Sequence, residues 1–219
     1  MKAMLLRVGI DKGTDGTLAP IFEDGSFEFI PISESVENSG ESRTYGNTKG
    51  RSGKLLSEYV PKSICNYTMH FDPEFDTFTY GDPTLKRIFL LKLRKGDLLV
   101  FYAGLAPYKN NVYQIALYII GYFLVDKVID FNILSKEEIK EYFKVYSNNA
   151  HVKRGDDTED LVIVVGNQNH SRLLKKAILI SKTMPDKKDR PYQAVSNDME
   201  KTAWYFWFNS KKYATEIYL

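Results

Sequence analysis

One imidazole and three carboxylates occupy alternate positions of the segment HFDPEFD: His70, Asp72, Glu74 and Asp76. Alternate residues of an extended chain share a face, so these groups can converge on one ligand. Imidazoles and carboxylates bind metal ions, but Pro73 interrupts a regular strand, and most metal sites need one more ligand than this segment supplies. The alternative is a polar loop in which Asp72 accepts hydrogen bonds from nearby backbone amides. We favour a binding loop over a metal site.

A second polar segment, NNAHVKR at residues 148–154, carries amide, imidazole and cationic groups. The Asn149 amide is suited to the edge of a base, and Arg154 is suited to a phosphate. The structural alternative is a helix C-terminus capped by an asparagine in the left-handed conformation. A cap explains the asparagines but leaves the histidine and the cations unexplained, so we expect Asn149, His151 and Arg154 to contact a ligand.

A third segment, TYGNTKGRSGK at residues 44–54, places basic residues beside an aromatic ring. Tyr45 could stack on a base while Arg51 holds the nucleic-acid backbone. The glycines do not follow the spacing of a phosphate-binding P-loop, so we do not expect nucleotide hydrolysis of that kind. A solvated flexible loop fits the same composition equally well.

The carboxylate of Asp11 follows the first expected strand, with Asp15 nearby. Metal-dependent nucleases place carboxylates at strand ends, and two-metal chemistry needs several of them together. No third carboxylate and lysine complete such a pattern here, and aspartate is also an ordinary turn former. We therefore expect Asp11 to be a polar residue of a pocket.

Composition limits the classes of function. The chain has 219 residues, 43% of them hydrophobic, and a net charge of only +2, which does not favour tight, sequence-independent DNA binding. Cys65 is the single cysteine, so an intramolecular disulfide and a cysteine-rich zinc site are excluded and a reducing cytoplasm fits. No apolar run reaches the ~18 residues that span a membrane, so we expect no membrane partner.

The sequence predicts both helices and strands to position these groups. Helical spacing and a capping box from Ser135 to Glu138 predict a helix over residues 134–147, and Asp24-Gly25 predicts a hairpin turn. Residues 33–54 are expected to be a long polar loop. Strands are predicted at 3–10, 95–105, 118–131, 161–166 and 178–183, and short helices at 84–93 and 167–177, the latter capped by Asn169. The absence of regular strand–helix–strand units favours an α+β fold.

Several segments resemble the third of the nucleotide-modification-associated domain families: VGIDKGTDGTLAPIFEDGSFEFIPI, TYGNTKG, HFDPEF, TYGDP, GDLLVFYAGL and NNAHVKR. They cover most of residues 5–154. The resemblance implies a link to systems that make or handle modified bases in DNA, and it carries over no catalytic residues. Separately, residues 90–131 resemble the PUA, ASCH, EVE and YTH domains, which bind RNA or modified bases. That resemblance implies a barrel with a pocket near Tyr102, at the end of the strand that follows Gly96.

We therefore expect an α+β protein with a mixed β-sheet or β-barrel core, PUA-like, decorated by short helices and long polar loops. It would form a single domain over residues 1–219, with a less distinctive C-terminal elaboration from about residue 184. The expected function is recognition of a nucleotide or a modified base in DNA or RNA, in modification or defence systems. A binding module is favoured over an enzyme.

The residues expected to bind the base or the nucleic acid are Asp11, Tyr45, Arg51, His70, Asp72, Tyr102, Asn149, His151 and Arg154. We expect neither a metal nor another cofactor. Two alternatives stay open. The first is a metal-dependent enzyme acting on nucleotides or nucleic acid through Asp11, His70 and Asp72. The second is an oligomeric scaffold that uses exposed aromatic residues, with its oligomeric state undefined.

Overall fold

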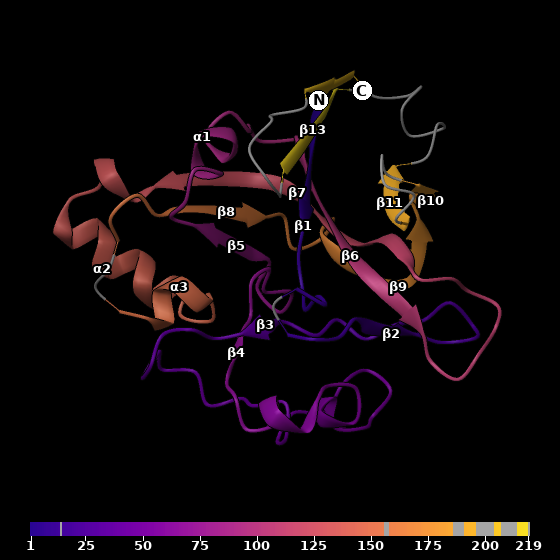
Figure 1. Cartoon of the computed structure of the whole chain (residues 1–219). Helices are drawn as coiled ribbons and strands as arrows, with labels where there is room; N and C mark the ends of the chain where they lie inside the picture. The colour runs from indigo at the N-terminus through magenta and orange to yellow at the C-terminus, as the bar shows by residue number, and fades with distance from the viewer. Residues whose placement is uncertain (14, 156–157, 186–190, 196–203, 207–213, 219) are drawn as a thin grey trace.

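The computed structural model describes the chain except at residues 14, 156–157, 186–190, 196–203, 207–213 and 219. Its core is one mixed sheet with the strand order β12-β13-β1-β6-β7-β8-β5, in which β2 pairs with β6 and β9 pairs with β7 (Figure 1). These strands are β1 (Lys2–Arg7), β2 (Ala19–Ile21), β5 (Thr79–Asp82), β6 (Leu98–Pro107), β7 (Ala116–Asp130), β8 (Val162–Gly166), β9 (Arg172–Leu179), β12 (Trp204–Phe206) and β13 (Ala214–Tyr218).

The two long strands at the centre, β6 and β7, form where the apolar runs predict them. The preceding turn is made by Gly96, whose φ of 90° suits glycine, and by Asp97, whose carboxylate accepts the backbone N–H of Lys2 at 2.7 Å. The strands pair antiparallel, and the rings of Phe101 and Phe123 lie 4.7 Å apart at the centre of the core. Burial of both rings explains why this hairpin dominates the fold.

The mixed sheet confirms the predicted α+β class. The sheet is open, however, because β12 and β5 lie at its two ends and no pairing between described strands joins them. Of the two core architectures expected from the sequence, the mixed sheet is therefore found and the closed barrel is not.

Helix α2 (Lys136–Val145) confirms the prediction for residues 134–147, including the capping box between Ser135 and Glu138. Helix α1 (Arg87–Leu90) is shorter than the predicted helix over 84–93. None of the described helices is both long and apolar enough to cross a membrane.

The prediction of a short helix over residues 167–177 is wrong. Residues 167–170 form a turn in which Asn167 accepts the N–H of Ser171 at 2.8 Å, and the chain then continues as β9 along β7. The Ser171 hydroxyl also accepts the N–H of Leu124 on β7 at 3.1 Å. Pairing with a long exposed strand edge thus overrides the local helical tendency. The single strand predicted at 178–183 is divided in the structure: its first two residues end β9, and residues 181–183 begin β10 (Ser181–Pro185), which pairs with β11 (Pro191–Val195).

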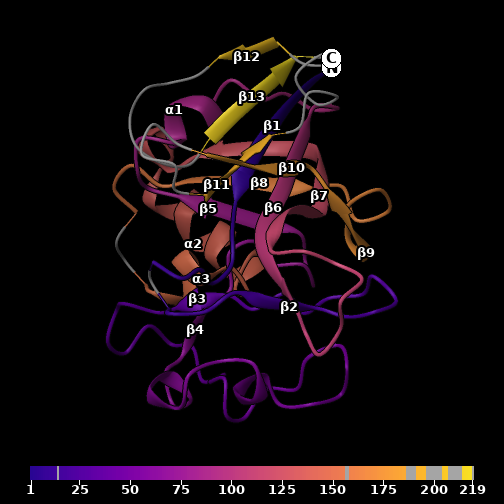
Figure 2. The same ribbon diagram turned by 45° about the vertical axis from the view of Figure 1, so that its right-hand side comes forward.

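Most of the predicted long loop lies in the segment between two short paired strands, β3 (Ile32–Ser33) and β4 (Met69–His70), at the bottom of both Figure 1 and Figure 2. The segment carries two single-turn helices, η1 (Leu56–Glu58) and η2 (Lys62–Ile64). It is anchored by the buried carboxylate of Glu28, which accepts the backbone N–H groups of Arg51 and Ser52, each at 2.7 Å. Those two amides are therefore occupied by the protein's own carboxylate.

Candidate histidine and carboxylate site

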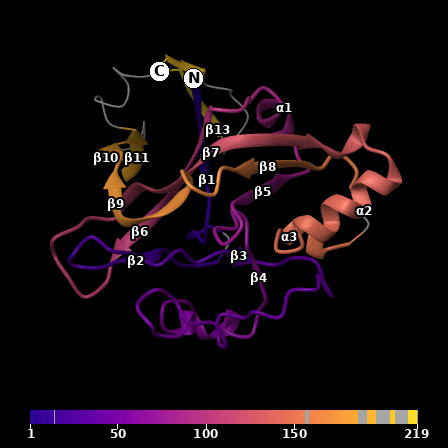
Figure 3. The same ribbon diagram turned by 180° about the vertical axis from the view of Figure 1, so that it is seen from behind.

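Three parts of the fold meet beside the β3–β4 pair. Strand β4 ends at His70, and Glu34 directly follows β3, where its N–H donates to Thr68 at 2.8 Å. Helix α3 (Ala150–Lys153) carries His151 and lies beside β3 and β5 in both Figure 1 and the reverse view of Figure 3. Segments far apart in the sequence thus supply side chains to one place, which we call the histidine cluster: His70, Asp72, His151, Glu34 and Arg154.

Glu34 fixes the first histidine. Its Oε2 lies 2.9 Å from Nδ1 of His70, and its carboxylate accepts two hydrogen bonds from Arg154, at 2.6 and 3.2 Å. The Glu34 side chain is 1% exposed. Burial alone would raise the pKa of Glu34, but the hydrogen bonds from His70 and Arg154 outweigh burial and hold that pKa well below its ordinary value. Glu34 is therefore an ionised acceptor.

The tautomer of His70 follows from these contacts. Nη2 of Arg154 also lies 3.1 Å from Nδ1 of His70, but a guanidinium only donates, and a protonated Nδ1 cannot accept. The contact with Glu34 is shorter and joins a ring N–H to a carboxylate, so we assign the Nδ1 proton to that hydrogen bond. With the proton on Nδ1, Nε2 is the ring nitrogen that offers a lone pair to a ligand.

The second histidine faces an aspartate. Nε2 of His151 lies 3.5 Å from Oδ2 of Asp72, and the two imidazole rings have centroids 4.8 Å apart at an angle of 84°. The other carboxylate oxygen, Oδ1 of Asp72, accepts the backbone N–H of Gly81 at 2.9 Å. This bond orients the carboxylate and leaves Oδ2 toward the imidazole.

Gly81 of strand β5 allows the helix with His151 to approach. A Cβ at position 81 would lie 2.6 Å from Cδ2 of His151 and 3.2 Å from Oδ1 of Asn149, closer than side chains pack. Asn149 is the N-cap of α3: its Oδ1 accepts the N–H of His151 at 2.9 Å, and its Nδ2 donates to Thr79 at 3.1 Å. Asn149 thus positions His151 and is itself fully buried.

A rim of half-buried cations borders the cluster. Arg43 and Lys153 both donate to Glu41, with Nη2 and Nζ each 2.7 Å from Oε2, and the Arg43 guanidinium lies 3.5 Å above the centre of the Phe71 ring. Burial alone would raise the pKa of Glu41, but hydrogen bonds from Arg43 and Lys153 lower it to about 2. The rim therefore consists of paired rather than isolated charges.

Four of the nine residues predicted to bind a ligand lie in the histidine cluster: His70, Asp72, His151 and Arg154. Asn149 lies directly behind it as a helix cap, not in a left-handed C-cap. Tyr45 is wholly buried behind β3, where its hydroxyl donates to the Pro31 carbonyl at 2.9 Å and burial raises its pKa. A buried ring cannot stack on a base, so Tyr45 supports the fold of this region.

Asp11, Arg51 and Tyr102 lie elsewhere. Asp11 forms an ion pair with Arg7 at 3.3 Å, and Arg51 donates to the carbonyl of Leu174 at 2.7 Å. Tyr102 packs against a separate apolar cluster around Ala3, Leu5 and Ile180. The expected nine-residue site is therefore divided, and the pocket expected near Tyr102 is not part of the histidine cluster.

The alternating face expected in HFDPEFD ends at Asp72. Beyond the cis peptide bond between Asp72 and Pro73, the buried Glu74 carboxylate accepts the N–H of Thr77 at 2.9 Å, while Asp76 is exposed. Sequence analysis missed Glu34, Glu41 and Gly81 as contributors. Gly81 lies in the motif TYGDP, but nothing in the spacing of Glu34 or Glu41 connects these residues to histidines much later in the chain.

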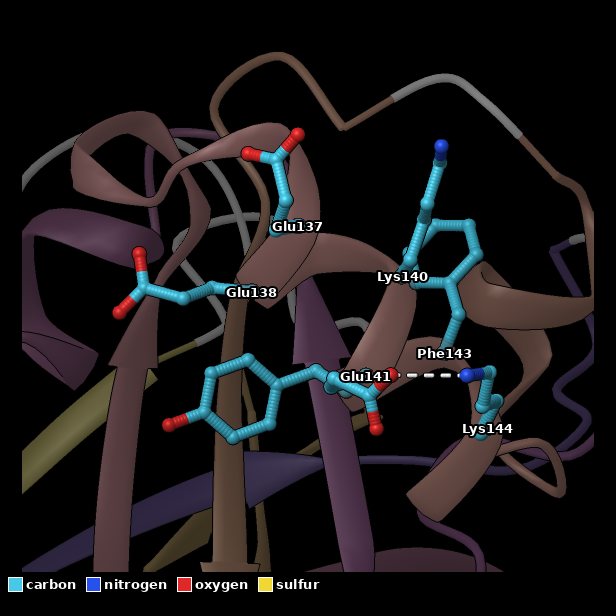
Figure 4. Close-up of a pocket in the computed structure, with 7 residues that line it drawn as sticks. Glu137, Glu138, Lys140, Glu141, Phe143 and Lys144 are labelled. Carbon is cyan, nitrogen blue, oxygen red and sulfur yellow. Dashed lines mark hydrogen bonds and ion pairs between the residues drawn. The ribbon is translucent and has the colours of Figure 1, made fainter.

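Two hollows lie away from the histidine cluster. One, of about 730 Å³, runs along α2 and is lined by side chains of that helix alone, including the ion pair between Glu141 and Lys144 at 2.7 Å (Figure 4). The other, of about 310 Å³, is bordered by Phe22, Phe27 and Arg51. The α2 hollow has exposed lysines and glutamates of a single helix as its polar groups, so we base no function on it.

Comparison with known proteins gives one match. The sequence profile described as nucleotide modification associated domain 3 matches residues 2–216. No curated protein and no solved structure matches the chain. The resemblance to PUA-like domains over residues 90–131 is thus not confirmed, whereas the resemblance based on HFDPEF, TYGDP and NNAHVKR is.

Proposed function

The chain belongs to the nucleotide modification associated domain 3 family, and on that premise we propose that it binds a nucleotide or a modified base of DNA or RNA at the histidine cluster. One observation carries this proposal. His70 and Arg154 come from segments 84 positions apart, yet their side chains lie 3.1 Å from each other, with Asp72 and His151 alongside. A cluster of polar groups assembled from such distant segments is typical of a ligand site.

The rim supplies the groups that a nucleotide needs. Arg43, Lys153 and Arg154 each retain N–H donors beyond those bound to glutamates, and such donors bind phosphate oxygens. The guanidinium of Arg43 covers Phe71 on one side, and its other face can stack on a base. In this proposal Arg43 takes the stacking role that the sequence suggested for Tyr45.

The charges of the site limit how tightly a bare phosphate can bind. With neutral histidines, the cations Arg43, Lys153 and Arg154 are balanced by the carboxylates of Glu34, Glu41 and Asp72. Recognition must therefore come from directed hydrogen bonds and stacking rather than from net positive charge. This agrees with the small net charge of +2 on the whole chain.

The test is a binding titration of the full chain. Fluorescence anisotropy would follow a panel of labelled oligonucleotides with ordinary and modified bases, and calorimetry would follow the matching nucleotides. Lys153→Met should weaken binding and lower the salt dependence by about one ion, because it removes a phosphate contact. Lys144→Met is the matched control, since this lysine forms an ion pair on the exposed face of α2. Failure of every ligand to bind, or an equal loss in both variants, would refute the proposal.

A second candidate function is a metal-dependent enzyme acting on nucleotides. It is favoured by the mutual approach of the possible ligand atoms of His70, Asp72 and His151, which all lie within 4.8 Å of one another. Asp11, which we expected to share that site, pairs with Arg7 instead. The enzyme hypothesis therefore depends on whether the three clustered groups bind an ion.

A further inference from the structure

We propose that His70, Asp72 and His151 together bind one divalent transition-metal ion. The three groups offer two imidazole nitrogens and one carboxylate oxygen within 4.8 Å of one another, and both histidines are more than 90% buried. The sequence predicted no metal here because HFDPEFD alone lacks a ligand. The missing ligand, His151, comes from α3 and lies beside Asp72 only in the folded chain.

The donor set selects the class of metal. Imidazole nitrogens suit Zn²⁺, Fe²⁺, Co²⁺ and Ni²⁺, whereas Mg²⁺ and Ca²⁺ prefer sites made of oxygen atoms alone. Two histidines and one carboxylate leave coordination positions open, as metal sites that bind a water or a substrate oxygen do. We therefore infer a first-row transition metal with an exchangeable position, and Zn²⁺ is the simplest probe.

Two of the three proposed ligands, His70 and Asp72, are held through their other polar atom. Nδ1 of His70 donates to Glu34, which leaves Nε2 for the ion, and Oδ1 of Asp72 accepts from Gly81, which leaves Oδ2. The helix cap at Asn149 fixes the backbone that carries His151. Such outer contacts orient ligands in metal sites and raise their affinity. In His70 and Asp72, one polar atom is therefore fixed by a partner and the other is available to an ion.

The possible ligand atoms of His70, Asp72 and His151 lie at separations that one ion can accommodate. Atoms that share one metal at ~2.0–2.2 Å lie roughly 3.0–3.5 Å from each other. Nε2 of His151 and Oδ2 of Asp72 are 3.5 Å apart, which is long for a charge-assisted hydrogen bond but within the range for two ligands of one ion. The widest separation in the set is at most 4.8 Å, so binding would close it by up to about 1.3–1.8 Å through rotation of the side chains.

The ion would also change the electrostatics of the site. Its two positive charges would turn a balanced set of side chains into a net positive one next to the Arg43, Lys153 and Arg154 rim, in surroundings from which most water is excluded. Phosphate oxygens would then bind at the open position of the metal. This last role rests on the proposed nucleotide function, whereas the metal site itself rests on the ligand geometry alone.

The test uses the full chain, freed of metal with a chelator and titrated with Zn²⁺ by calorimetry and with Co²⁺ by visible absorption, in the absence of nucleotides. We expect one equivalent to bind, and X-ray absorption to show nitrogen and oxygen ligands without sulfur. His151→Gln and Asp72→Asn should each weaken Zn²⁺ binding about 100-fold or more, and Glu34→Gln about 10- to 100-fold. His170→Gln is the matched control, because His170 is the third histidine of the chain and is exposed.

The outcomes separate the metal site from the nucleotide function. Failure of the wild-type chain to bind Zn²⁺ would overturn the metal site whether or not the variants fold, and so would loss of binding in His170→Gln alone. Thermal unfolding of the metal-free variants shows whether a loss reflects misfolding, and the ligand set from X-ray absorption of the wild type needs no variant. Zn²⁺ binding without any nucleotide affinity would refute only the proposed function, and equal nucleotide affinity with and without metal would refute only the link between them.

Discussion

Gly81→Ala should move His151 without altering any proposed ligand. The new Cβ would lie 2.6 Å from Cδ2 of His151, whereas carbon atoms pack at about 3.5–4.0 Å, so the ring must retreat by about 1 Å. Gly81 lies in β5, paired with β8, and its backbone conformation is one that alanine adopts readily. The effect of the substitution is therefore steric and directed at the imidazole.

The magnitude follows from the cost of overpacking. Inserting a methyl group into a packed site costs about 1–3 kcal/mol. If the displaced imidazole bears that cost, Zn²⁺ affinity falls between about fivefold and about 150-fold, since about 1.4 kcal/mol corresponds to a factor of ten. Calorimetric titration of Gly81→Ala with Zn²⁺, compared with the wild type, measures the change.

Two further variants make the result specific. Gly104→Ala, in β6, is the matched control, because its nearest neighbour is the flexible end of Leu18 at 3.0 Å, and it should bind Zn²⁺ as the wild type does. In a His151→Ala background, Gly81→Ala should reduce stability in urea by less, because the ring that makes the closest contact is gone and only the contact with Oδ1 of Asn149 at 3.2 Å remains. Wild-type Zn²⁺ affinity in Gly81→Ala, or an undiminished stability loss in the double variant, would refute the reasoning.

Three predictions concern stability. The pKa of Glu41 falls from its ordinary 4.5 to about 2 on folding, so its stabilising effect is full above pH 4.5 and is lost as the pH falls toward 2. The loss in free energy of unfolding caused by Glu41→Gln, measured in urea, should therefore be smaller at pH 3 than at pH 7. An equal loss at both pH values would contradict this. Glu28→Gln should cost about 2–4 kcal/mol in urea unfolding, since two amide bonds to a buried charge are impaired; an unchanged midpoint would argue against that anchor. Ser135→Ala should cost about 1 kcal/mol through loss of the capping box and leave Zn²⁺ affinity unchanged, whereas an altered affinity would link α2 to the site.

The predictable parts of the fold are those that local sequence determines. The turn at Gly96, the apolar runs of β6 and β7 and the capping box of α2 each specify their structure within a few residues. Strand β9 was mispredicted as a helix because its conformation depends on the edge of β7, to which it is linked through Ser171. A single sequence gives no sign of that pairing.

In the candidate site too, some features follow from local sequence and others depend on contacts between distant segments. Residue type alone identified His70, Asp72, His151 and Arg154 as chemically capable, but their grouping depends on the β3–β4 pair and on the docking of α3 against β5. Tyr45 was mispredicted as a stacking ring because an aromatic residue in a polar loop can face either the ligand or the core, and here burial decided the outcome.

In the proposed metal site, side chains from β4, from the turn after it and from α3 bind one ion. The most direct measurement is a crystal structure of the full chain grown with Zn²⁺, with anomalous scattering recorded at the zinc edge. We expect a single strong peak about 2.0–2.2 Å from a nitrogen of His70, a nitrogen of His151 and an oxygen of Asp72. Zinc bound only at other residues, with these three side chains still apart, would contradict it.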